Sequence, residues 1–167
     1  MLQFLLVQIF PLAMLTAGAM DVLSFKIPNW LSIVLFIGFL LTAQISASPL
    51  QLVLSHLLAG LVILLLGFGM FTQGWVGGGD AKLLAAAALW FGFEHLLPFL
   101  LWTTMLGGVL ALFLITYRRV LPPLWLIRQP WAMRLHDSRE GIPYGVALAG
   151  ASLIVYPQTI WMTGIAG

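Results

Sequence analysis

Long apolar segments, each about the length of a membrane-spanning helix, recur along the whole chain. A helix that crosses a bilayer needs about 20 mostly apolar residues. Only 7% of the 167 residues are charged, whereas a water-soluble domain carries about 25%. We therefore expect an all-α, polytopic integral membrane protein with about six transmembrane helices, at residues 2–20, 30–46, 52–73, 81–93, 97–117 and 144–164.

The connections between these segments indicate one membrane-embedded domain over residues 1–167. The only long connection, residues 118–143, mixes tryptophan and other apolar residues with arginine, a composition typical of the lipid headgroup layer. No basic residue precedes the first apolar run, so we expect it to be a span and not a cleaved signal peptide. Cysteine is absent, which excludes disulfides and thiolate chemistry, and the seven basic residues are too scattered for nucleic-acid binding.

Basic residues occur only in alternate connections. Lys26 follows the first expected span, Lys82 lies at the start of the fourth, and the other five basic residues are arginines within residues 118–143. Cytoplasmic connections of membrane proteins carry an excess of lysine and arginine. With six spans, these three connections would face the cytoplasm and both termini would lie outside.

Two of the three aspartates stand at the ends of spans on that same side. Asp21 is at the end of the first span, and Asp80 begins the fourth, directly after Gly77, Gly78 and Gly79. An acidic residue at a membrane edge is costly and marks a candidate functional site. Two carboxylates that face each other share a proton, so one could act as a base and the other as an acid during hydrolysis. The glycines predict a bare backbone loop against which an extended substrate could lie.

Simpler interpretations exist for both acids. Asp80 could cap the helix that it begins, and Asp21 could be an interfacial residue that ends a span. Lys82 is expected to extend toward the headgroups, away from any catalytic role. Metal binding by the two carboxylates is a weaker alternative, and we expect neither a metal nor a cofactor, because the three histidines lie in different segments without ligand spacing: His56, His95 and His136.

Three motifs together resemble those of the type IV prepilin peptidases, which are GxGD aspartic membrane proteases. Residues 77–82 resemble the GxGD motif, residues 21–31 resemble the first aspartate motif, and residues 142–147 resemble the third signature, at the start of the last span. The resemblance covers almost the whole chain. It implies an endopeptidase that removes a basic leader from prepilin or pseudopilin precursors at the cytoplasmic membrane face, with Asp21 and Asp80 as catalytic residues.

The chain resembles the short branch of that family, which serves tight-adherence (Flp-type) pili. It lacks the extra cytoplasmic domain with CxxC motifs found in longer members, so N-methyltransferase activity is not expected. The resemblance implies a multi-pass protein of the inner (plasma) membrane. Because the leader and the cytoplasmic side of the protein are both basic, we expect anionic membrane lipids to attract the leader.

Two alternative functions remain. A related GxGD protease could act on preflagellin-like precursors, which would use the same chemistry on another substrate. A non-enzymatic transporter or assembly subunit could instead use the acids for ion passage. Acids at one membrane edge, with none near mid-span, argue against a transmembrane proton relay. The sequence makes no prediction about the oligomeric state.

Overall fold

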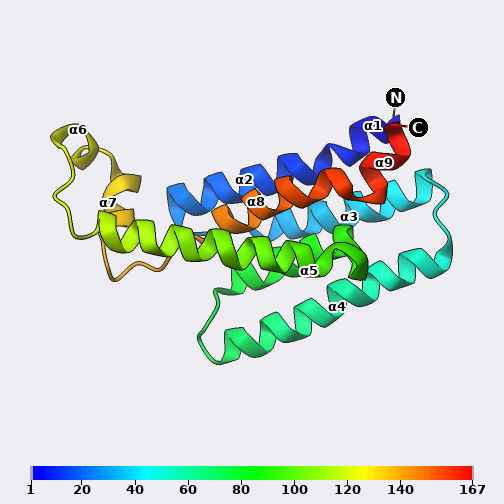
Figure 1. The fold of residues 1–167 in the computed structure, drawn as a ribbon, viewed down its shortest axis with the longest axis horizontal. Helices are drawn as coiled ribbons and strands as arrows, with labels where there is room; N and C mark the ends of the chain where they lie inside the picture. The colour runs from blue at the N-terminus through cyan, green and yellow to red at the C-terminus, as the bar shows by residue number, and fades with distance from the viewer. Residues whose placement is uncertain (1, 167) are drawn as a thin grey trace.

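The helices pack side by side along one long axis (Figure 1). The computed structural model describes residues 2–166, which form helices and connections with no strand among them. The two termini lie at one end of the bundle, and α6 and α7 lie at the other. The elements are α1 (Leu2–Val7), α2 (Ile9–Ser24), α3 (Asn29–Ile45), α4 (Leu50–Thr72), α5 (Gly78–Tyr117), α6 (Leu124–Ile127), α7 (Pro130–His136), α8 (Tyr144–Val155), the 3₁₀ helix η1 (Tyr156–Gln158) and α9 (Ile160–Ala166).

Within the described residues, three helical stretches are long and apolar enough to cross a membrane: Gln3–Ser24, Leu50–Thr72 and Gly78–Tyr117. The apolar helix α3 is shorter, with 17 residues. The outer faces of these helices expose many large apolar side chains, as lipid-facing helices do. The all-α membrane fold is therefore confirmed, whereas the number of six spans remains a prediction.

The helix α5 is folded back on itself at Gly92. This residue has φ +57° and ψ −175°, a conformation that a residue with a Cβ atom rarely adopts, and the chain reverses its direction there (Figure 1). The first limb, residues 78–91, is mostly buried, whereas the second limb, residues 93–117, exposes much of its surface. These limbs correspond to the expected fourth and fifth spans, and the short fourth one forms the centre of the bundle.

Side chains from neighbouring helices bind the free carbonyl groups at the end of this first limb. The last carbonyls of a helix have no partner within it. A ring nitrogen of His56 bonds the Leu89 carbonyl at 2.6 Å, and the Trp161 indole N–H donates to the Trp90 carbonyl at 2.7 Å. His56 is buried. It is therefore a core residue whose ring provides a hydrogen-bond partner for the Leu89 carbonyl.

The C-terminal segment differs from the single helix expected over residues 144–164. It consists of α8, η1 and α9, and the break coincides with Pro157, which has no N–H to continue a helix. The hydroxyl of Tyr156 donates to the Val7 carbonyl at 2.7 Å. That carbonyl has no N–H partner one turn later, because Pro11 occupies the position. The hydrogen bond at this break thus links the C-terminal segment to the N-terminal segment.

All the connections that carry basic residues lie at the end of the bundle with α6 and α7 (Figure 1). The termini and the connection between α3 and α4 lie at the opposite end. This arrangement agrees with a one-sided distribution of basic residues. The side of the membrane that this basic end faces remains a prediction.

Candidate active site

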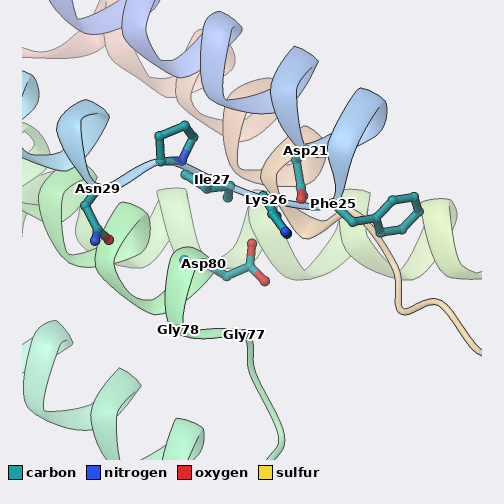
Figure 2. Close-up of a pocket in the computed structure, with 10 residues that line it drawn as sticks. Asp21, Phe25, Lys26, Ile27, Asn29, Gly77, Gly78 and Asp80 are labelled. Atoms are coloured by element: carbon teal, nitrogen blue, oxygen red, sulfur yellow. The ribbon is translucent and has the colours of Figure 1, made fainter. Parts of the chain in front are cut away.

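A pocket of about 540 Å³ opens at the basic end of the bundle. It is lined by Asp21 from α2, by residues 25–28 of the connection between α2 and α3, by Asn29 at the start of α3, and by residues 77–80 at the start of α5. Figure 2 shows the carboxylates of Asp21 and Asp80 directed into the same space beside this connection. The structure thus brings together the two acids that the sequence singled out, although 59 positions of chain separate them.

Asp21 is buried in the last full turn of α2, with 5% of its surface exposed. The first span was predicted to end at residue 20, whereas the helix continues to Ser24, so Asp21 lies inside its last turn. Its Oδ2 accepts a hydrogen bond from the Gly145 N–H at 2.7 Å. Gly145 is the second residue of α8, where backbone N–H groups have no partner within the helix and the helix dipole favours a negative charge.

Asp80 is the third residue of α5, inside its first turn. The cap position belongs to Gly77, and no side chain caps this helix, so the interpretation of Asp80 as the helix cap is wrong. Its Oδ1 atom is buried and has no hydrogen-bond partner within the part of the chain that the structure describes. A buried polar oxygen without a partner is rare in proteins and points to a role beyond stability.

The three glycines before Asp80 form less of a loop than expected. Only Gly77 is extended, with φ −66° and ψ 142°, whereas Gly78 and Gly79 belong to the first turn of α5. A Cβ atom on Gly79 would lie 3.2 Å from the Ile27 Cβ, so the lack of a side chain here lets the connection approach the helix. Of the three glycines, Gly77 is exposed, whereas Gly78 and Gly79 are partly buried.

The connection between α2 and α3 crosses the pocket as an extended segment (Figure 2). It leaves α2 at Phe25, which has a left-handed φ of 53°, and Pro28 favours an extended residue before it. Ile27 fills the space between the two helix starts, close to Gly79 and also to Gly145, where an added Cβ would lie 3.1 Å from its Cδ1. This side chain therefore fixes the spacing of the elements that carry the acids.

Lys82 joins this connection to α5. Its ammonium group donates to Asn29 Oδ1 at 3.1 Å, and the side chain is exposed. The lysine was expected only to extend toward the headgroups. Its contact with Asn29 also ties the start of α3 to the helix that carries Asp80.

Two contributors to the site were not predicted from the sequence. The motif at residues 142–147 gave no role for Gly145, whose N–H binds Asp21. Arg118 was expected to mark the side of the membrane and to bind lipid headgroups. Its Nε donates to the Leu135 carbonyl at 2.9 Å, and its Nη2 to the carbonyls of Gly141 at 2.8 Å and Glu140 at 3.0 Å. Arg118 thus holds the returning chain four residues before Gly145.

The pocket therefore presents two carboxyl groups in different environments. Asp21 is held by a backbone N–H, while Asp80 has an oxygen free for another partner. Such a pair can hold a water molecule between a base and an acid, as in aspartic proteases. No group of three or more histidine, aspartate and glutamate side chains gathers within residues 2–166, so any metal ion would rest on the two carboxylates alone.

A comparison with protein families identifies a matching family. The model of the "Type IV leader peptidase family" matches residues 8–112. That range contains both aspartates, the connection across the pocket and most of α5, and it ends before the long connection and α8. No match was found among curated proteins or among solved structures.

Proposed function

This chain belongs to the type IV leader peptidase family, and we propose that it is a membrane aspartic endopeptidase that cleaves the basic leader peptide from type IV (Flp-like) prepilins. The observation that carries the proposal is the pair of carboxylates, Asp21 and Asp80, that line one pocket at the basic end of the bundle. We further propose that this end faces the cytoplasm and that the membrane is the inner (plasma) membrane, because lysine and arginine gather there.

The two environments suggest a division of labour between the acids. A backbone N–H stabilises a negative charge on Asp21, so the shared proton resides on Asp80. Asp21 takes a proton from water as the water oxygen bonds to the scissile carbonyl carbon, and Asp80 gives its proton to the carbonyl oxygen. When the C–N bond breaks, Asp21 returns its proton to the leaving amine, and Asp80 recovers one from a hydroxyl of the tetrahedral intermediate as this becomes the carboxylic acid. The protons balance, and both acids return to their starting states.

The substrate backbone would reach this pair past the extended residue Gly77. A cleavage segment bound in extended form can pair its own N–H and carbonyl groups with exposed backbone. Gly77 is exposed at the pocket, whereas Gly78 and Gly79 support the site from within the helix. We propose that Gly77 contacts the substrate and that the other two glycines act by permitting close packing.

The connections between the helices guide the choice of substrate. Its connections contain no cysteine, so we propose a peptidase of the tight-adherence type without N-methyltransferase activity. An enzyme that cleaves preflagellin-like precursors would use the same pair of acids and is distinguished by its substrate alone. No observation favours a transporter, since the two acids that the structure brings together, Asp21 and Asp80, line one pocket at one end of the bundle.

Membrane lipids would help to bring the leader to the site. The basic end exposes large apolar side chains beside its arginines, including Trp75, Leu121 and Trp125, a composition suited to the headgroup layer. A basic leader gains about 1 kcal/mol per lysine or arginine near an anionic surface. We propose that anionic headgroups, which also hold the arginines of this end, concentrate the leader beside the pocket.

The test is cleavage of co-expressed precursors by single variants. Asp21→Asn and Asp80→Asn should each abolish processing of a Flp-type prepilin, while the variant proteins reach normal levels in the membrane. Asp137→Asn is the matched control, because Asp137 is an exposed aspartate at the same end of the bundle and should not affect cleavage. A parallel assay with a preflagellin as the precursor would identify the substrate class, since the two precursors are then compared directly.

Two results would count against the proposal. Near-normal processing by either the Asp21 or the Asp80 variant would exclude the acid pair as the catalytic centre. Failure of the unaltered protein to cleave any precursor of either class, in a membrane where it is correctly inserted, would exclude the peptidase itself.

A further inference from the structure

A second hollow lies beside the active-site pocket, on the flank of the bundle between α3 and α4. It measures about 370 Å³ and is lined almost entirely by apolar side chains. Phe36 and Ser32 come from α3, Leu61 and Leu64 come from α4, and Ala85 and Ala86 of α5 form its floor. We refer to this hollow as the flank groove.

The flank groove exists because α3 and α4 both pack on α5 and hardly touch each other. The two helices are closest at the short connection that joins the end of α3 to the start of α4. They diverge toward the basic end, with the first limb of α5 between them (Figure 1). Gly60 and Gly67 allow α4 to lie close against α5, since a Cβ on Gly67 would be 3.1 Å from the Ala81 Cβ. The small side chains of Ala85 and Ala86 leave space above this part of α5.

The groove leads toward the active-site pocket. Lys82 lines the flank groove, its ammonium group bonds Asn29, and Asn29 lines the pocket that holds Asp80. From Lys82 to Leu89 the groove follows two turns of α5, about 10 Å of helix. The hollow is therefore a membrane-facing extension of the site, with its one charged residue at the site end.

On the basis of the proposed function, we infer that the flank groove receives the apolar helix that follows the cleavage point in the precursor. A precursor anchored by an apolar helix must keep that helix in the lipid while its cleavage point reaches Asp80. An apolar groove floored by small residues allows close approach of a helix within a membrane, and this groove connects lipid to the pocket. The helix enters sideways between α3 and α4, and its start lies beside Lys82.

The absence of native cysteine permits a direct crosslinking test. Single cysteines are placed in the groove at Leu61 or Phe36 and, as controls, at Leu58 or Ile37. The paired positions belong to the same helices and have similar exposure, 50% and 52% on α4 and 43% and 50% on α3, but the controls do not line the groove. Each variant also carries Asp80→Asn, so that the precursor is retained, and the precursor has one cysteine in its apolar helix.

The groove cysteines should crosslink to the precursor helix at least tenfold more efficiently than the control cysteines. Equal crosslinking from the groove cysteine and the control cysteine of the same helix would overturn the inference, and so would a disulfide between two copies of the Leu61→Cys protein that excludes the precursor. The latter result would assign the groove to a second copy of this chain.

A kinetic arm separates the groove from the catalytic chemistry. In Leu61→Trp, cleavage of the full precursor should show a KM about tenfold higher, a loss of about 1.4 kcal/mol in binding, with kcat little changed. Cleavage of a short soluble peptide that lacks the apolar helix should be unaffected, and Leu58→Trp should behave as the unaltered enzyme does. Equal loss on both substrates, or no effect of Leu61→Trp on the precursor, would refute the groove while leaving the peptidase proposal intact.

Discussion

The contact between Gly145 and Asp21 gives a sharp test of the active-site geometry. In Gly145→Ala, the new Cβ would lie 2.9 Å from both the Cβ and the Oδ2 of Asp21, and 3.1 Å from the Ile27 Cδ1. Ordinary contacts of a Cβ atom begin near 3.4 Å. Because α2 and α8 are close-packed along their length, the strain cannot be relieved locally, and the Asp21 carboxylate must move by about 0.5 Å.

The magnitude follows from two effects of this displacement. A misplacement of about 1 Å costs roughly a hundredfold in rate, so about half of that distance costs roughly tenfold. Weakening the 2.7 Å bond from the Gly145 N–H adds to the loss, because a hydrogen bond to a charged group contributes about 1.5–3 kcal/mol. We expect kcat to fall by about 10- to 100-fold. KM should change little, because no substrate contact is removed.

The assay is cleavage of a purified prepilin by the variant in lipid nanodiscs, with thermal unfolding measured in parallel. Alanine favours a helix over glycine by about 1 kcal/mol, which offsets part of the strain, so the protein should still fold. Gly150→Ala is the matched control in the same helix, since its Cβ meets only the flexible end of Leu106, at 3.0 Å. Full activity of a folded Gly145→Ala protein would refute the proposed role of the Asp21 carboxylate.

Four further outcomes are expected. Gly79→Val should reduce cleavage more than Gly79→Ala does. A Cβ at position 79 already lies 3.2 Å from the Ile27 Cβ, and the two further methyl groups of valine would displace Ile27; equal rates in a cleavage assay would contradict this. Arg118→Lys should lower kcat, because a lysine ammonium lacks the planar fork by which Nε reaches the Leu135 carbonyl while Nη2 reaches those of Glu140 and Gly141, and an unchanged kcat would remove Arg118 from the support of the site. A cysteine at Ser138 should react with an impermeant thiol reagent only from the cytoplasm and one at Ser48 only from outside, and the reverse labelling would invert the topology. Cleavage in vesicles should rise with anionic lipid content and fall with added salt, whereas rates insensitive to both would exclude the lipid surface as the carrier of the leader.

The helices and the grouping of the two acids could be predicted from the sequence, because both depend on local patterns. Apolar runs mark the helices, and the basic residues place Asp21 and Asp80 at the same end of the bundle. The reversal at Gly92 was anticipated only as the boundary between two spans. Its conformation depends on packing against His56, whose ring would lie within 3 Å of an added Cβ.

The contacts between helices could not be predicted, since apolar residues cover every face of a helix that lies in lipid. In a water-soluble protein the apolar face marks the core, but here leucine lies both in the core, as Leu31, Leu35 and Leu83 do, and on the exposed outer faces of the helices. The bond from Gly145 to Asp21 joins residues 124 positions apart and depends on how α8 packs against α2. Arg118 likewise bonds backbone carbonyls, which carry no signature in the sequence.

The distance along the chain between Asp21 and its N–H donor has a consequence for biogenesis. A protein is synthesised from its N-terminus, so α2 and both limbs of α5 enter the membrane before α8 is made. At that stage the nascent protein already contains Asp21 and Asp80, but Asp21 lacks the N–H group of Gly145 that holds its carboxylate. Under the proposed mechanism, the carboxylate of Asp21 is held in place only after α8 has been inserted, and we expect an incomplete translation product that lacks α8 to be inactive.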